Sequence, residues 1–120
     1  MNPLLTKSGL ADDAIVAFRF VKLTSTGIAA ATAGTDKIAG VMSQDTDAAA
    51  GDTAPYTVVG VAKVEASTAI AIGAYVTATT AGKAVTTVTA GDVVRGIALE
   101  AATADGDLIN VLLTYFHHKA

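Results

Sequence analysis

The chain has 120 residues and a net charge of −3, a length typical of one domain with a modest core. Its eight basic residues are scattered and its pI is about 5.1, which argues against nucleic-acid binding, because phosphate neutralisation needs clustered Lys and Arg. The mean hydropathy of +0.51 comes mainly from 26 alanines, and no run approaches the roughly 18–20 apolar residues of a membrane-spanning helix, so no membrane partner is expected.

The N-terminal segment Met1–Asp13, MNPLLTKSGLADD, differs from the rest of the chain. It contains no apolar run of the length that a secretory signal needs. It also lacks hydrophobic periodicity, and Pro3 disfavours a helix. We therefore predict an extended N-terminal arm, residues 1–13, which gains main-chain hydrogen bonds by adding to the sheet edge of a partner. Three apolar side chains of this arm would be buried in such a contact: Leu4, Leu5 and Leu10.

The remaining chain alternates β-rich segments with short stretches of Gly, Asp and Thr. The enrichment in β-branched residues predicts strands at Ile15–Leu23, Ala54–Ala66, Ala74–Ala78, Asp92–Glu100 and Asp107–Phe116. Gly and Asp predict turns at Ala49–Asp52, Thr80–Lys83, Thr89–Asp92 and Ala104–Asp107. The Ala-rich pieces QDTDAAAG and LEAATA are expected to form a single helical turn each. Short strands at this spacing indicate an all-β fold, a small barrel or sandwich.

An internal repeat divides the β region into two halves. The segment Ala14–Gly27 aligns without a gap with Ala69–Gly82, with five identities in fourteen. After one inserted residue, Asp36–Ala48 aligns with Asp92–Ala104, including Gly40 with Gly96 and Ala48 with Ala104. Self-similarity of this kind is a fold-level signal. We predict one β domain at residues 14–116, with pseudo-repeats at about 14–64 and 69–113 related by a pseudo-two-fold axis, and a C-terminal tail at 117–120.

No residue pattern predicts catalysis, a cofactor or a metal. The two histidines, His117 and His118, lie in the predicted tail, where a general base is poorly positioned. There is no cysteine, which excludes disulfides and thiolate ligands. The segment Asp45–Asp52 has the D-x-D spacing of a calcium loop but lacks its later ligands, so these side chains are expected to cap turns.

The segment GTDKIAGV, Gly34–Val41, resembles the hairpin that presents the modified lysine of lipoyl and biotinyl carrier domains. In that interpretation Lys37 would carry the prosthetic group at the tip of a turn. The repeat favours a different role, because the position of Lys37 is Val93 in the second half, whereas Asp36 and Asp92 repeat. The segment is then a turn followed by a strand.

Three motifs together resemble the capsid decoration proteins of tailed bacteriophages, also called cement or head-stabilising proteins. The most specific motif is GIALEAATADGDLINVLL at Gly96–Leu113, followed by GVAKVEASTAIAIGAYV at Gly60–Val76 and IAGVMSQDTDAAAGD at Ile38–Asp52. The resemblance extends from about Thr26 to Phe116. The family often begins with a short strand near the N-terminus, whereas Met1–Asp13 is a polar, Pro-containing lead.

This resemblance implies a non-enzymatic virion protein on the outer face of the capsid, made in the host cytoplasm. Such a protein forms a homotrimer, binds the major capsid protein and bridges neighbouring capsid subunits against internal pressure. We assign the capsid contact to the predicted arm, through Asn2, Pro3, Leu4, Leu5, Thr6, Lys7 and Leu10. Two alternatives remain open: the carrier domain with Lys37 as the modified residue, and a head-fibre or spike-base module for adhesion.

Overall fold

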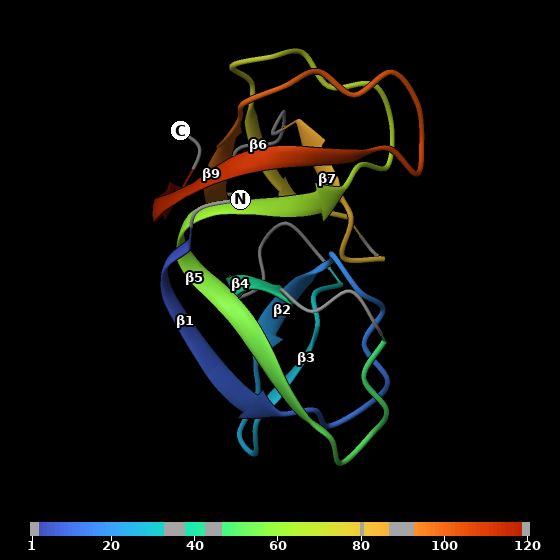
Figure 1. The fold of residues 1–120 in the computed structure, drawn as a ribbon, viewed down its shortest axis with the longest axis vertical. Coiled ribbons are helices and arrows are strands. Elements are labelled where there is room, and N and C mark those ends of the chain that lie inside the picture. Colours follow the sequence, from blue (N-terminus) through green and yellow to red (C-terminus); the bar gives the residue numbers. More distant parts are fainter. Residues whose placement is uncertain (1–2, 33–37, 43–46, 80, 87–92, 119–120) are drawn as a thin grey trace.

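The computed structural model describes residues 3–32, 38–42, 47–79, 81–86 and 93–118, and in this part of the chain it contains nine strands and no helix (Figure 1). This confirms the predicted all-β fold. The expected helical turns are wrong for 47–51 and 99–104, where turns and single β-bridges occur instead. None of the described residues forms a helix long and apolar enough to cross a membrane. The strands are β1 Pro3–Leu10, β2 Phe20–Leu23, β3 Ile28–Ala30, β4 Ile38–Met42, β5 Thr53–Glu65, β6 Tyr75–Ala78, β7 Ala84–Thr86, β8 Val93–Ala98 and β9 Leu108–His118.

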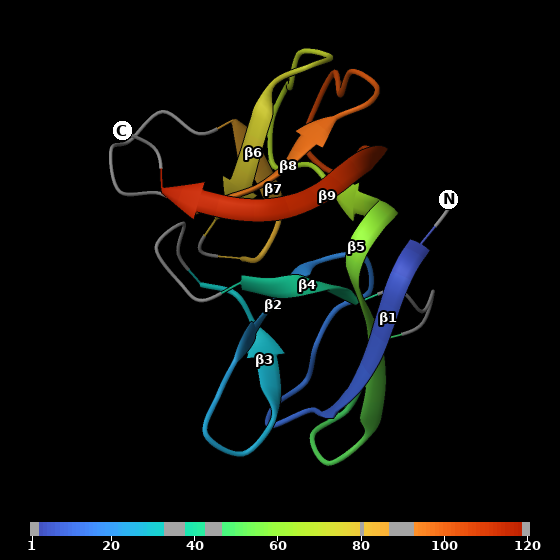
Figure 2. The ribbon, with the colours of Figure 1, turned by 90° about the vertical axis from the view of Figure 1, so that its left-hand side faces the viewer.

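One antiparallel sheet runs through the molecule in the order β3-β2-β4-β5-β9-β8-β6-β7, and β1 also pairs with β5. The long strand β5 lies in the middle of this order and pairs with β4 on one side and β9 on the other. Its Gly60 pairs with Pro3 of β1 and with Leu113 of β9, and has a φ of 111°, a conformation that Gly adopts without steric cost. We call residues 3–59 the N-half and residues 60–118 the C-half. Figures 1 and 2 show the two halves stacked along the longest axis, with β5 passing between them.

The N-terminal segment differs from the predicted arm, because Pro3–Leu10 forms β1 within the protein's own sheet. Its main chain pairs with β5 from Pro3, opposite Gly60, to Leu10, opposite Thr53. Register shifts on either side of Leu5 disturb the alternation of side chains, which explains why periodicity gave no strand signal. The C-terminal tail differs in the same way: β9 continues to His118, and His117 and His118 pair with β8.

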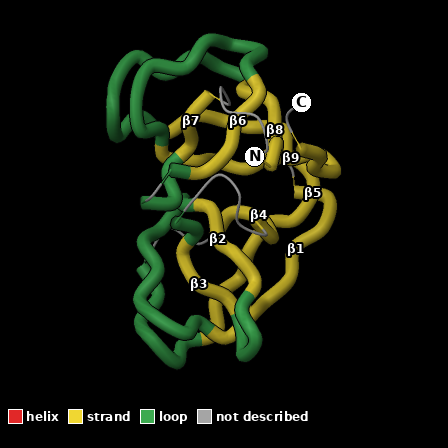
Figure 3. Tube along the Cα trace, turned by 180° about the vertical axis from the view of Figure 1, so that it is seen from behind, coloured by secondary structure: helices red, strands yellow, loops and turns green. Residues whose placement is uncertain are grey.

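The same backbone hydrogen bonds occur in both halves. Ile15 exchanges two hydrogen bonds with Ala48, and Ile70 exchanges two with Ala102. The Ala11 N–H donates to the carbonyl of Asp52, and in the C-half the Ala66 N–H donates to that of Asp107. A duplicated half-domain produces such a pattern. The structural counterpart of Ala48 is therefore Ala102, and the sequence alignment with Ala104 was wrong by two positions. Figure 3 shows that the connecting loops of both halves lie mostly along one side of the molecule.

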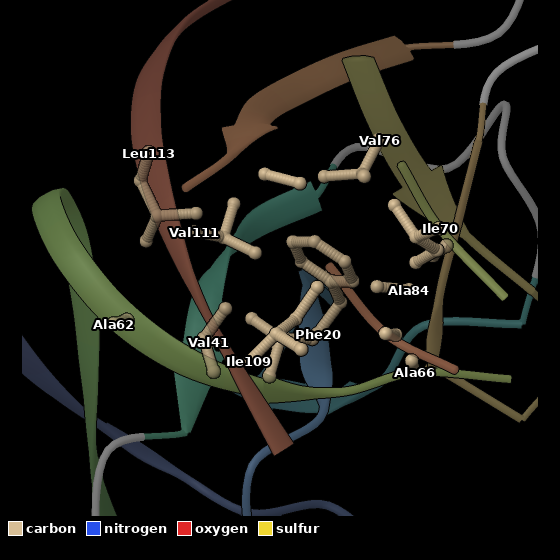
Figure 4. Packing of buried hydrophobic residues seen from close by; sticks show 14 of the residues in the cluster. Phe20, Val41, Ala62, Ala66, Ile70, Val76, Ala84, Ile109, Val111 and Leu113 are labelled. Atoms are coloured by element: carbon tan, nitrogen blue, oxygen red, sulfur yellow. The ribbon is translucent and has the colours of Figure 1, made fainter. Parts of the chain in front are cut away.

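The backbone repeats, but the two cores are filled differently. The N-half core contains Ile28, Met42 and Tyr56, and the corresponding positions of the C-half are Ala84, Ala98 and Val111. The smaller side chains of the C-half leave space that the N-half fills. Phe20 of β2 is fully buried in the C-half cluster, and Figure 4 shows its ring near Ile109, Val111 and Ala84. Packing of this aromatic ring therefore joins the halves into one core.

The contact between the halves is not symmetric. Phe20 is 0% exposed, whereas its counterpart Tyr75 is 54% exposed. Ala78 of the C-half is 3% exposed, whereas its counterpart Leu23 is 54% exposed. A two-fold axis would give counterparts equal burial. The predicted pseudo-two-fold relation is therefore wrong, and each half uses a different face for the contact.

A buried arginine connects the halves beside this core. Arg95 of β8 donates hydrogen bonds to the carbonyl oxygens of Ile38 at 3.1 Å, Ala39 at 3.0 Å and Val58 at 2.7 Å. Burial lowers the pKa of Arg95 from its ordinary value, yet a guanidinium stays charged at neutral pH. The counterpart of Arg95 in the N-half is Ala39, whose side chain has no hydrogen-bond donor. The N-half therefore cannot make the same contact with the C-half from this position. The planar side chain thus anchors the C-half on strands β4 and β5 of the N-half.

Truncation of the shared aromatic ring should be costly. We expect Phe20→Ala to lower the free energy of unfolding by about 3–5 kcal/mol, because it leaves a cavity at the junction of the halves. The matched variant Tyr75→Ala removes the counterpart side chain from an exposed position and should cost less than about 1 kcal/mol. Urea unfolding followed by circular dichroism measures both values, and equal losses for the two variants would contradict the proposed packing.

Loss of the buried guanidinium should also destabilise the protein. Arg95→Met keeps much of the apolar stem but removes the donors to three carbonyl groups, so we expect a loss of at least about 2 kcal/mol. Arg19→Met is the control, since Arg19 makes longer bonds, to Glu65 at 3.4 Å and to the carbonyl of Ala81 at 3.3 Å. The control should lose less than about 1 kcal/mol in the same unfolding measurement. A smaller loss for Arg95→Met than for Arg19→Met would refute the anchoring role.

Candidate interaction surfaces

Two acidic side chains at equivalent turns of the halves, Asp52 and Asp107, accept hydrogen bonds from the backbone. The Asp52 carboxylate accepts the Ala49 N–H at 3.0 Å, and in the C-half the Asp107 carboxylate accepts the N–H groups of Thr103 and Ala104. These bonds and the bond from the Thr103 hydroxyl lower the pKa of Asp107. For Asp52 this confirms the predicted capping of turns. Within the described residues, no three His, Cys, Asp or Glu side chains lie close enough to hold a metal ion.

The sequence-predicted contact residues lie on or next to β1. Asn2 and the candidate carrier residue Lys37 lie outside the described residues. Pro3, Leu4, Leu5 and Thr6 belong to β1, whose main chain pairs with β5. Lys7 is exposed, and Leu10 is 47% exposed. In the described part of the chain β1 pairs as a strand only with β5, and just beyond it Ala11 forms a parallel bridge with Ile28.

An apolar face that the sequence analysis missed covers the outer side of the C-half sheet. Tyr75 pairs with Ile97, Ile97 pairs with Leu112, and Leu112 pairs with Val61, so their side chains form a row across four strands. Leu99 and Leu108 are also exposed, with the pair Lys63–Asn110 lying between Leu112 and Leu108 on the same face, whereas Val61, Ile97 and Leu112 are half-buried. We call the six residues Val61, Tyr75, Ile97, Leu99, Leu108 and Leu112 the Tyr75 face.

A sequence signal for this face did exist. The start of β9 reads LINVLL, so apolar side chains occur on both sides of the strand. Ile109, Val111 and Leu113 are buried in the core, which leaves Leu108 and Leu112 on the outer side. A strand that is apolar on both sides is typical of a sheet covered on both faces. The pattern therefore indicates that something covers the outer side as well.

The β2–β3 hairpin forms the opposite end of the molecule (Figure 2). Leu23 is exposed there, and beside it lies an open pocket of about 420 Å³ whose lining includes Asp12, Lys22 and Thr24. The Asp12 carboxylate accepts hydrogen bonds from the hydroxyls of Thr24 and Thr26, the latter at 2.8 Å. The bond from Thr24, followed by that from Thr26, lowers the pKa of Asp12. This network fixes the hairpin against the segment that follows β1.

These observations describe a β domain with exposed apolar side chains in both halves and, within its described residues, no metal-binding cluster. The chain belongs to the phage cement protein family, whose model matches residues 5–113. Family membership gives it a structural role in association with the phage capsid. Its fold is similar to the crystal structure of the head fiber gp8.5 N base in bacteriophage phi29, with a TM-score of 0.68 and 21% sequence identity over 92% of this chain and 93% of that chain. No curated protein sequence matches the chain significantly.

The Asp12 network predicts a pH-dependent contribution to stability. Because the pKa of Asp12 is lower in the folded protein than the ordinary value of 3.8, its contribution is present above that value and is lost as the pH falls through the folded pKa. We expect Asp12→Asn to be less stable than wild type at pH 7 and equally stable at strongly acid pH. Urea unfolding at several pH values measures the difference, and NMR titration of the Asp12 carboxyl should give a midpoint below 3.8.

The neighbouring variant Asp13→Asn is the control. It removes the same charge at the next position without removing the two hydrogen bonds from Thr24 and Thr26. The pH-dependent loss should therefore be smaller than for Asp12→Asn. A midpoint for Asp12 at or above 3.8 would contradict the role assigned to the network.

Proposed function

We propose that this protein binds the outer surface of a phage capsid as a homotrimer and stabilises the shell by bridging major capsid subunits. Membership of the cement protein family supports this proposal. The observation that carries it is the presence of exposed apolar side chains on both halves of one small domain, on the Tyr75 face and at Leu23. A bridging protein needs more than one contact surface, whereas a catalytic domain needs a cluster of reactive groups.

The capsid contact is assigned to β1. β1 pairs as a strand only with β5, and we propose that its main-chain N–H and C=O groups on the other side, before the approach of Leu10 to Gly27, accept a further strand. An extended segment of the major capsid protein can add to such an edge as a further strand, with exposed side chains such as Leu10 giving specificity. The contact residues remain those predicted from the sequence, from Asn2 to Lys7 together with Leu10. Their mode of binding changes, because β1 accepts a strand instead of adding as a free arm.

The base of a head fibre is a second candidate function. Its specific support is the fold, which is similar to that of the phi29 head fiber N base over almost the whole length of both chains. A fibre base also attaches to the capsid but carries further protein outward. The two functions differ in their effect on the shell, because bridging stabilises it against heat and a fibre base need not.

Binding to purified shells tests the proposal. We expect the protein to co-sediment with shells assembled from the major capsid protein and to raise their melting temperature in calorimetry. Leu10→Asp places a charge beside the sheet edge and should weaken binding by about tenfold or more. The control Val16→Asp makes the same kind of change at an exposed apolar residue outside β1 and should bind like wild type.

Three results would count against the proposal or a part of it. Binding without any rise in shell melting temperature would favour the fibre-base function. Absence of co-sedimentation with shells from the phage that encodes the protein would refute capsid binding altogether. Equal binding by Leu10→Asp and wild type would remove β1 as the contact.

A further inference from the structure

Two adjacent carboxylates, Asp12 and Asp13, line the open pocket of about 420 Å³ beside the β2–β3 hairpin. Asp12 is used by the fold, because its carboxylate accepts hydrogen bonds from the hydroxyls of Thr24 and Thr26. Asp13 is exposed, and within the described part of the chain no hydrogen bond or ion pair reaches its carboxylate. The pocket therefore contains one carboxylate that the hairpin holds in place and one that is available to a ligand.

The repeat shows that the backbone does not require these two charges. Asp12 and Ser67 occupy equivalent positions, because the N–H of each donates at 2.9 Å to the carbonyl of the first residue of β3 or β7. The next positions are Asp13 and Thr68, so the C-half follows the same path with uncharged residues. By contrast, the carboxylates that cap the turns before β5 and β9 recur in both halves. The charge of Asp13 is therefore specific to the N-half and is not needed to shape the chain.

The remaining lining of the pocket suits a long basic side chain. Its third charged residue is Lys22, so two carboxylates and one ammonium group give the lining a formal charge of −1. The Lys22 ammonium donates to the Thr32 hydroxyl at 3.2 Å. The half-buried methyl groups of Ala29 and Ala30 offer an apolar contact to the aliphatic stem of a lysine or arginine. The charged end of such a side chain then pairs with a carboxylate, and a guanidinium does so through two parallel hydrogen bonds.

The pocket adjoins the end of β1. The β2–β3 hairpin lies against this end, because a Cβ on Gly27 would be 2.0 Å from the carbonyl oxygen of Leu10. Leu10 is 47% exposed, and Leu23 of the same hairpin is 54% exposed. Exposed aliphatic side chains and an available carboxylate therefore lie on one surface, next to the strand to which the capsid contact is assigned.

We propose that this pocket binds a lysine or arginine side chain of the major capsid protein, carried by the segment that adds to β1. This pairing deepens the proposed function, on which it rests, by naming the chemistry that selects the added segment. Hydrogen bonds between main chains give affinity, whereas side-chain pockets give specificity. An ion pair between the basic side chain and Asp13 fixes the register of the segment and disfavours segments that carry an acidic residue at this position.

Reversal of the charge at Asp13 tests the proposal. We expect Asp13→Lys to weaken co-sedimentation with purified shells about tenfold or more, because two like charges then meet in the pocket. Asp105→Lys is the matched control: it makes the same reversal at an exposed carboxylate of the C-half that does not line the pocket, so it should bind like wild type. Urea unfolding followed by circular dichroism establishes that both variants are folded. Equal binding by the two variants would overturn the proposal.

Salt dependence gives an independent readout of the ion pair. Asp13→Asn removes the charge with little change of shape, and its binding to shells at low salt should be about threefold or more weaker than that of wild type. The difference should shrink as the NaCl concentration rises, because salt screens an ion pair at the surface. A difference that stays constant with salt, or no difference at low salt, would contradict the ionic contact.

Shell binding also separates this pocket from the proposed function. If Leu10→Asp weakens binding and Asp13→Lys does not, the contact at β1 stands and the role of the pocket fails alone. If Asp13→Lys weakens binding and wild type does not raise the melting temperature of the shells, the role of the pocket stands and bridging fails. If wild type does not co-sediment with the shells of its own phage, both fail together.

Discussion

Burial of Phe20 in the C-half is the interaction on which the rest of the structure depends. A half-domain of this length forms only a small core, and the C-half has smaller core side chains than the N-half, because Ala84 and Ala98 stand where the N-half has Ile28 and Met42. The ring of Phe20 restores the missing packing and fixes which face of the N-half meets the C-half. Arg95 then anchors the same arrangement through three carbonyl groups. The asymmetry of the molecule follows from this one insertion.

The repeat is preserved where the backbone requires it and has diverged where side chains pack. Gly40 and Gly96 recur because a Cβ at either position would collide with the neighbouring strand, at the carbonyl of Thr57 or of Leu112. Gly51 and Gly106 recur because both turns need a positive φ, 89° and 94°. At a third pair the requirement is met by different residues: Phe18 has a φ of 63° where the C-half has Gly73 at 85°.

Sequence reasoning located the long strands but not their burial. β5, β6, β8 and β9 begin within about one residue of the predicted bounds, because each is a run of β-branched and apolar residues between Gly or Asp turns. The strand predicted at Ile15–Leu23 is shortened to Phe20–Leu23, since the backbone turns at Phe18. β3 and β7, with three residues each, are too short for a periodic signal. The sequence analysis missed the Tyr75 face because Phe20 and Tyr75 occupy the same repeat position. Only the tertiary contact between the halves buries Phe20 in the core and leaves Tyr75 on the surface.

That difference connects the fold to the proposed role on a capsid. A symmetric duplication would bury both rows in one closed contact and leave no apolar face for other partners. The observed contact instead buries the Phe20 row and leaves Tyr75, Leu99 and Leu108 of the C-half exposed. In the proposed homotrimer, linked copies would place several β1 strands on the shell at once, so that contacts which are weak individually add as one multivalent interaction. A small domain without a large contact surface of its own would stabilise a shell in this way.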